Sequence, residues 1–104
     1  MAASADRIRL DLNSPEFLDV FLRLETADLK QVVSALDRLR QLDWNTLYRH
    51  QGFHWEAIEH LKGPGNATVY SVRLSQRIRA IALRDREFLR LVSLRPDHDS
   101  AYKR

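Results

Sequence analysis

Apolar residues in the first half of the chain recur first at the spacing of a strand and then at that of helices. From Arg7 to Leu12, apolar and polar positions alternate strictly, which predicts a short strand with one buried face. Ser14 followed by Pro15 predicts a helix start, because serine caps the first amide groups and proline fits the first helical position. Thr26 is predicted to cap a second helix. The two are expected to form an antiparallel hairpin that extends to Leu42.

The second half of the chain changes to the period of strands. A short helical turn from Trp44 to His50 is expected to end near Gly52. Four strands joined by tight turns follow, and tight turns make them antiparallel neighbours: Trp55–Leu61, Thr68–Leu74, Ile78–Leu83 and Phe88–Leu94. The predicted fold class is therefore α+β, a helical hairpin packed on an antiparallel sheet in the order β-α-α-β-β-β-β. A single domain is expected to span residues 1–104.

Composition narrows the class of protein. The chain has no cysteine and no apolar run near the roughly 20 residues that a membrane span needs. A cytoplasmic protein without a membrane partner is the expectation. His50 and His54 have a helical metal-ligand spacing, but Gly52 between them breaks the helix. No metal and no other cofactor is therefore expected.

Positive charge is concentrated toward the end of the chain. Residues 1–61 hold ten acidic and seven basic residues, whereas residues 73–95 hold seven arginines and two acids. Arginine binds phosphate through two parallel hydrogen bonds and stacks on bases, so this segment predicts a surface for RNA or another polyanion. An acidic protein partner fits the same charge. The candidate RNA-binding residues are Lys62, Arg77, Arg84, Arg86, Arg90 and Arg95.

Residues suited to metal-free RNA cleavage lie at or beyond the ends of the predicted strands. Cleavage through the 2′-hydroxyl of RNA needs a base, an acid and fixed cations that hold the charge developing at phosphorus. Glu59 is the candidate base and His98 the candidate acid. Arg73 and Arg79 would hold the phosphate, and Tyr102 would stack on a base.

The same residues also fit structural roles. Glu59 and Lys62 fit solvent-facing charges at a strand end. His98, flanked by two aspartates, fits a surface turn held by local hydrogen bonds. Tyr102 fits a ring packed on the sheet. Three other aromatic residues are expected in the core rather than in a stacking platform: Trp44, Phe53 and Trp55.

The order of the elements and three sequence runs resemble the RelE/ParE superfamily of bacterial toxins. The runs are EHLKG at 59–63, YSVRLSQRIRAIAL at 70–83 and LVSLRPDHDSAY at 91–102. The resemblance implies a type II toxin: a metal-independent, ribosome-dependent endonuclease that acts on mRNA in the ribosomal A site and is silenced by a cognate antitoxin. It assigns the base to Glu59 and matches Arg79, His98 and Tyr102 to site residues of the family.

Two features depart from the nuclease members of that superfamily. Some of them carry lysines on the strand that here contains Val69–Val72, and acids flank His98 on both sides. Two other functions therefore stay open: a ParE-like inhibitor of DNA gyrase without nuclease activity, and a catalytically idle module that binds RNA or the antitoxin. A gyrase inhibitor needs none of Glu59, Arg79 and His98. The oligomeric state is left undetermined.

Overall fold

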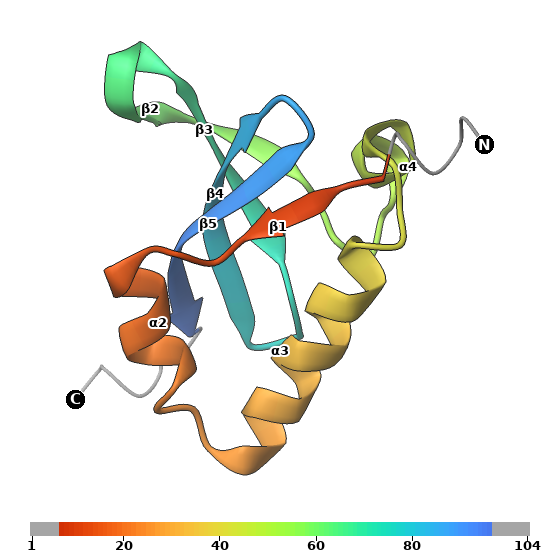
Figure 1. Ribbon diagram of the computed structural model, residues 1–104, viewed down its shortest axis with the longest axis vertical. Helices are drawn as coiled ribbons and strands as arrows, with labels where there is room; N and C mark the ends of the chain where they lie inside the picture. The colour runs from red at the N-terminus through yellow and green to blue at the C-terminus, as the bar shows by residue number, and fades with distance from the viewer. Residues whose placement is uncertain (1–6, 97–104) are drawn as a thin grey trace.

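A mixed five-stranded sheet organises the protein, for which a computed structural model describes residues 7–96 (Figure 1). The strand order is β1-β5-β4-β3-β2. Strands β2 to β5 pair antiparallel, whereas β1 pairs with β5 in parallel. The strands are β1 (Arg9–Asp11), β2 (Glu56–Lys62), β3 (Thr68–Arg73), β4 (Ile78–Asp85) and β5 (Phe88–Pro96). The predicted α+β class is confirmed, with one parallel pair at the sheet edge.

Within residues 7–96, three α-helices and one 3-10 turn accompany the sheet. They are α2 (Pro15–Phe21), α3 (Thr26–Leu39), α4 (Trp44–Arg49) and the turn η1 (Pro64–Asn66). The predicted helix start at Ser14 is confirmed, since its hydroxyl accepts a hydrogen bond from the Phe17 N–H at 3.4 Å. The predicted cap at Thr26 is wrong by one residue. Glu25 has the extended backbone of a cap, so Thr26 is already the first helical residue.

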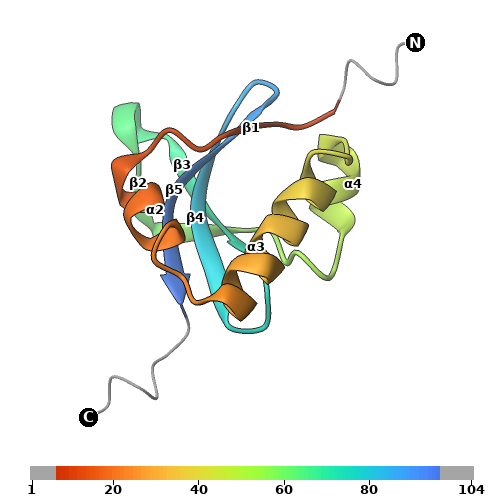
Figure 2. The same ribbon diagram turned by 60° about the horizontal axis from the view of Figure 1, so that its bottom comes forward.

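Helices α2 and α3 occupy different parts of the sheet. Both views place α2 next to β5 and α3 along the side of β3 and β4 (Figures 1 and 2). Strand β1 pairs only with the start of β5, at Phe88–Arg90, and leaves the rest of that edge to α2. The Ser14 hydroxyl donates to the Val92 carbonyl at 2.7 Å. The residue that starts α2 therefore also covers an otherwise open strand edge.

The core lies between α3 and one face of the sheet. Val72, Ala80 and Leu94 are directly paired across β3, β4 and β5, and all three are buried. The buried side of α3 packs into the same hydrophobic core. Ala80 and Ala82 keep the central strand small on this face, which leaves room for the helix. Trp44 and Phe53 are buried as predicted, whereas Trp55 is half-buried and stacks on Tyr70.

Asp43 fixes the start of α4. Its carboxylate accepts a hydrogen bond from the Thr46 N–H at 2.8 Å. The hydrogen bonds from the Thr46 N–H and hydroxyl favour the charged carboxylate and lower the pKa of Asp43. The stabilisation is present at neutral pH and is lost as pH falls through the lowered pKa.

Within residues 7–96, no helix combines the length and apolar character that crossing a membrane requires.

Replacing Ser14 tests the link between α2 and β5. Ser14→Ala is expected to lower the free energy of unfolding by about 1–2 kcal/mol, the usual cost of losing a serine cap. It also removes the hydrogen bond to the Val92 carbonyl. Denaturant unfolding measures the change. Ser34→Ala, at an exposed position within α3, is the control and should leave the midpoint nearly unchanged. Equal midpoints for the two variants would contradict the assigned role.

Candidate functional site

Three arginines lie in one row across the face of the sheet turned away from α3. Arg73 is directly paired with Arg79, and Arg79 with Arg95. Directly paired residues project from the same face, and their neighbours Val72 and Ala80 are buried toward α3. None of the three forms an ion pair within residues 7–96. Like charges placed directly opposite repel each other, so a bound anion would stabilise the row.

An open cavity of about 670 Å³ adjoins this arginine row. Strands β2, β3, β4 and β5 all contribute to its lining. The polar side chains around it are His54, Glu56, Glu59, His60, Ser71, Arg79 and Arg95. The structure thus brings together three of the predicted site residues: Glu59, Arg79 and Arg95. Arg73 lines a separate, smaller cavity of about 210 Å³, together with His50, Phe53 and Arg38 of α3.

Glu59 lies in an irregular part of β2. Ile58 pairs with Val69 and Lys62 with Thr68, so three residues of β2 are inserted between two adjacent residues of β3. Glu59 is the first of these three and is exposed. The strand ladder therefore does not fix its position relative to the arginine row.

A histidine–glutamate pair lies in the same cavity. His54 Nε2 is 2.6 Å from Glu56 Oε2. Glu56 is in register with Ser71, which pairs in turn with Ile81, so the pair is on the face of the arginine row. This pair was not predicted from the sequence, in which His54 was considered only as a metal ligand. The available signal was Trp55, which was expected in the core: the two neighbours of such a residue in a strand point away from the core.

Two arginines of the predicted cluster are neutralised by carboxylates. Arg77 pairs with Asp28 of α3 at 3.7 Å. Arg90 pairs with Asp11 at 3.4 Å and with Asp85 at 3.0 Å. These pairs are partly exposed and contribute little to stability, but they reduce the charge available to an outside anion.

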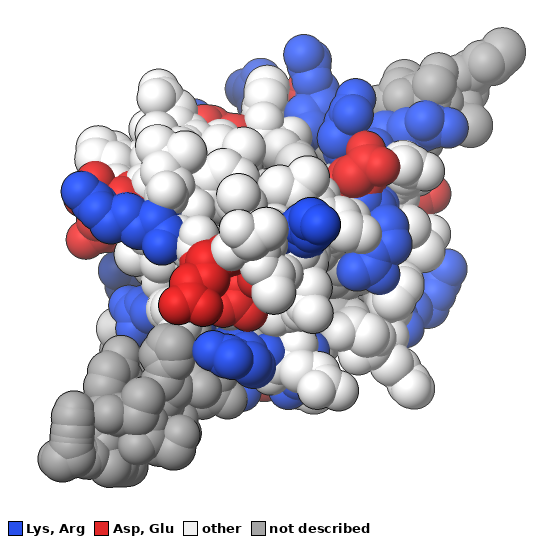
Figure 3. Space-filling view, turned by 90° about the horizontal axis from the view of Figure 1, so that it is seen from below, with Lys and Arg blue, Asp and Glu red and all other residues white. Residues whose placement is uncertain are grey.

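The remaining predicted RNA-binding residues lie apart from the row. Arg84 stacks over the ring of Trp44, 4.4 Å from its centroid, and donates a hydrogen bond to the Tyr48 hydroxyl. Arg86 is in the exposed turn between β4 and β5, and Lys62 is at the exposed end of β2. The seven arginines therefore do not form one surface. Seen from below, acidic and basic side chains are interspersed on the face in view (Figure 3).

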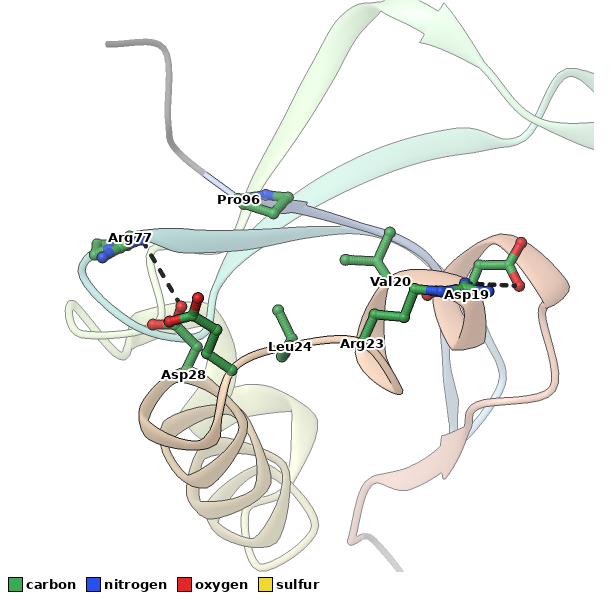
Figure 4. A pocket seen from close by; sticks show the side chains of 8 residues that line it. Asp19, Val20, Arg23, Leu24, Asp28, Arg77 and Pro96 are labelled. Carbon is green, nitrogen blue, oxygen red and sulfur yellow. Dashed lines mark hydrogen bonds and ion pairs between the residues drawn. The ribbon is translucent and has the colours of Figure 1, made fainter. Parts of the chain in front are cut away.

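A second cavity, of about 520 Å³, lies between the end of α2 and the start of α3 (Figure 4). Val20, Leu24 and Pro96 give it an apolar lining. Four of the five charged residues in its lining form two ion pairs, Arg23–Asp19 and Arg77–Asp28. The larger cavity, by contrast, contains Arg79 and Arg95, which form no ion pair within residues 7–96, together with glutamate and histidine side chains. We therefore take the larger cavity as the candidate site.

Two predicted site residues, His98 and Tyr102, lie outside the residues that the structure describes. Within the described part of the chain, no group of three or more histidine, aspartate or glutamate residues is placed to hold a metal ion.

Comparison with known proteins supports the fold. No protein-family model and no curated protein matches the chain. Among solved structures, the chain is similar to one in the crystal structure of the archaeal RelE–RelB complex from Pyrococcus horikoshii OT3. The TM-score is 0.61 at 18% identity, over 89% of this chain and 98% of the matched one. The fold is thus RelE-like, as the sequence resemblance implied.

The arginine row predicts how binding to RNA depends on salt. Each phosphate neutralised on a single strand releases about 0.7 counterion, so three contacts give a log–log slope of magnitude about 2. Arg95→Gln is expected to reduce this slope by about 0.7. Arg90→Gln is the matched control on the same strand, because its charge is already paired. Fluorescence anisotropy with a short single-stranded RNA, from about 50 to about 200 mM salt, measures both. A flat response of the parent, or equal losses in the two variants, would contradict the assignment.

Proposed function

We propose that this protein is a type II toxin that cleaves mRNA at the ribosome without a metal ion and is neutralised by a cognate antitoxin. The observation that carries the proposal is the unpaired arginine row, next to a carboxylate and a histidine, on a RelE-like fold. A row of guanidinium groups suits the phosphate of an RNA backbone.

The chemistry follows from charge and proton transfer. Attack of a 2′-oxygen on the adjacent phosphorus concentrates negative charge on the phosphate oxygens, and fixed cations stabilise that charge most strongly in the transition state. Arg79 and Arg95 border the cavity where that phosphate would bind, with Arg73 beside them. In this proposal His98 protonates the leaving 5′-oxygen and Tyr102 stacks on a base.

An antitoxin partner is supported by two observations. The similar solved structure is a complex of RelE with RelB. In this chain, three unpaired arginines on one open face would attract cellular RNA indiscriminately. A partner that presents an acidic amphipathic segment would neutralise the row and exclude RNA from the cavity.

Arg79 is the sharpest single test of the proposed function. Arg79→Ala is expected to abolish growth inhibition and to lower mRNA cleavage by about 10²- to 10³-fold, the usual effect of removing one stabilising group. Arg79 is exposed, so its loss should cost little stability. The measurements are bacterial growth after induction and mapping of mRNA 5′ ends.

Arg90→Ala is the matched control for Arg79→Ala, since it removes an arginine that is already paired with carboxylates. It should remain toxic. An Arg79→Ala protein as active as the parent would contradict the proposal. Toxicity of the parent without mRNA cleavage would favour a gyrase inhibitor, and absence of toxicity would favour an idle binding module.

The partner is tested by purifying the protein from its native source. The complex is expected to contain a small protein with an acidic amphipathic segment, and RNA binding by the complex should be weaker than that of the free toxin. Isolation of the protein alone, or unchanged RNA binding in the complex, would contradict the proposed antitoxin surface.

A further inference from the structure

The hydrogen bond between His54 and Glu56 determines which imidazole nitrogen is available for chemistry. A carboxylate can only accept, so the Nε2 that lies 2.6 Å from Glu56 Oε2 carries the proton. In the neutral imidazole, Nδ1 is then left as the acceptor. Within residues 7–96, Nδ1 has no hydrogen-bond donor as partner. This is the arrangement of a histidine base oriented by a carboxylate.

The backbone holds His54 in place although its side chain is exposed. Its φ of 50° lies in the left-handed region, which is uncommon for residues other than glycine and is found disproportionately at functional sites. On one side Phe53 is buried, and its carbonyl accepts from the Arg73 N–H at 2.7 Å. On the other side Trp55 stacks on Tyr70 of β3. The two anchored aromatic residues present the imidazole at the start of β2.

Strand register places this pair beside the phosphate-binding arginines. Glu56 is opposite Ser71, and Ser71 is opposite Ile81, two residues after Arg79 on β4. His54, Glu56, Arg79 and Arg95 line one cavity. By contrast, Glu59 is in the irregular segment of β2, where no ladder pair fixes it.

A purely structural role does not explain why His54 and Glu56 are held in this arrangement. The two side chains are 61% and 58% exposed, and exposed ion pairs contribute little to stability. A left-handed backbone adds a further cost. The pair thus has a geometry suited to proton transfer without the burial that stabilises a fold.

We propose that His54 is the general base of RNA cleavage and that Glu56 is its positioning residue; this inference rests on the function proposed above and gives His54 the role assigned to Glu59. His54 Nδ1 takes the proton of the 2′-hydroxyl. The 2′-oxygen forms a bond to the adjacent phosphorus, and the P–O5′ bond breaks with its electron pair on the 5′-oxygen. That oxygen takes a proton from the general acid, or from water. The products are a 2′,3′-cyclic phosphate and a 5′-hydroxyl, and His54 returns its proton to solvent.

The test compares two histidines and two glutamates of the same cavity. Single-turnover cleavage of a defined mRNA on stalled ribosomes is measured for His54→Gln, Glu56→Gln, His60→Gln and Glu59→Gln. His54→Gln is expected to lower the rate by about 10²-fold or more, as for loss of a general base. Glu56→Gln should lower it by about 10-fold, since the imidazole remains but loses its orientation. Glu59→Gln and His60→Gln should each lower it less than His54→Gln does, whereas Glu16→Gln, at an exposed position of α2 outside the cavity, should stay near the parental rate.

The pH profile separates chemistry from structure. A base must be unprotonated, so the parental rate should rise with pH through the range in which histidine loses its proton. His54→Gln should lose this rise, and Glu56→Gln should keep it at a lower rate. Thermal unfolding of each variant verifies that the fold is retained.

The Arg79→Ala variant, measured alongside the others, separates the proposed cleavage of mRNA from the assignment of His54 as its base. If the parent cleaves, Arg79→Ala does not, and His54→Gln keeps the parental rate and pH profile, the inference is overturned and the proposed function stands. A large loss in Glu59→Gln with a normal His54→Gln protein would assign the base to Glu59. A parent that cleaves no RNA would overturn both.

Discussion

The register between β3, β4 and β5 is the constraint on which the rest of the structure depends. Val72, Ala80 and Leu94 share one face of the sheet and are buried in the core. Their sequence neighbours Arg73, Arg79 and Arg95 must therefore project from the opposite face. A shift of one residue in the pairing register would turn the arginines toward α3 and expose the core residues to water. The same hydrophobic burial that holds the sheet to its helix therefore aligns Arg73, Arg79 and Arg95 on the open face.

This alignment separates two kinds of arginine. Arg77 and Arg90 are paired with carboxylates, and Arg84 stacks over Trp44, so these side chains already have partners within the fold. The arginines of the row form no ion pair within residues 7–96, and Arg95 donates a hydrogen bond only to the Ser93 hydroxyl, at 3.3 Å. The repulsion between these arginines favours a bound anion on that face, which is the basis of the proposed binding of RNA phosphates.

Local chemistry explains what the sequence predicted correctly. The period of strands and the turn residues between them are visible without tertiary information, so strand positions in the second half were predicted well. The Ser14 cap followed from the serine–proline pair. The cap predicted at Thr26 was wrong by one residue. Which residue caps a helix depends on the backbone angles of the segment that precedes the helix. In the connection from α2 to α3, Glu25 is the residue with the extended backbone of a cap.

The sequence by itself determined the α+β class, the strand periodicity and the presence of many arginines near the end of the chain. Only the tertiary structure decided which of those arginines lie together, and that His54 pairs with Glu56 next to Arg79. The physical reason is register. Neighbours across a sheet are set by pairing between segments far apart in the sequence, and an irregular segment such as the one at Glu59 changes that pairing in a way no local pattern records.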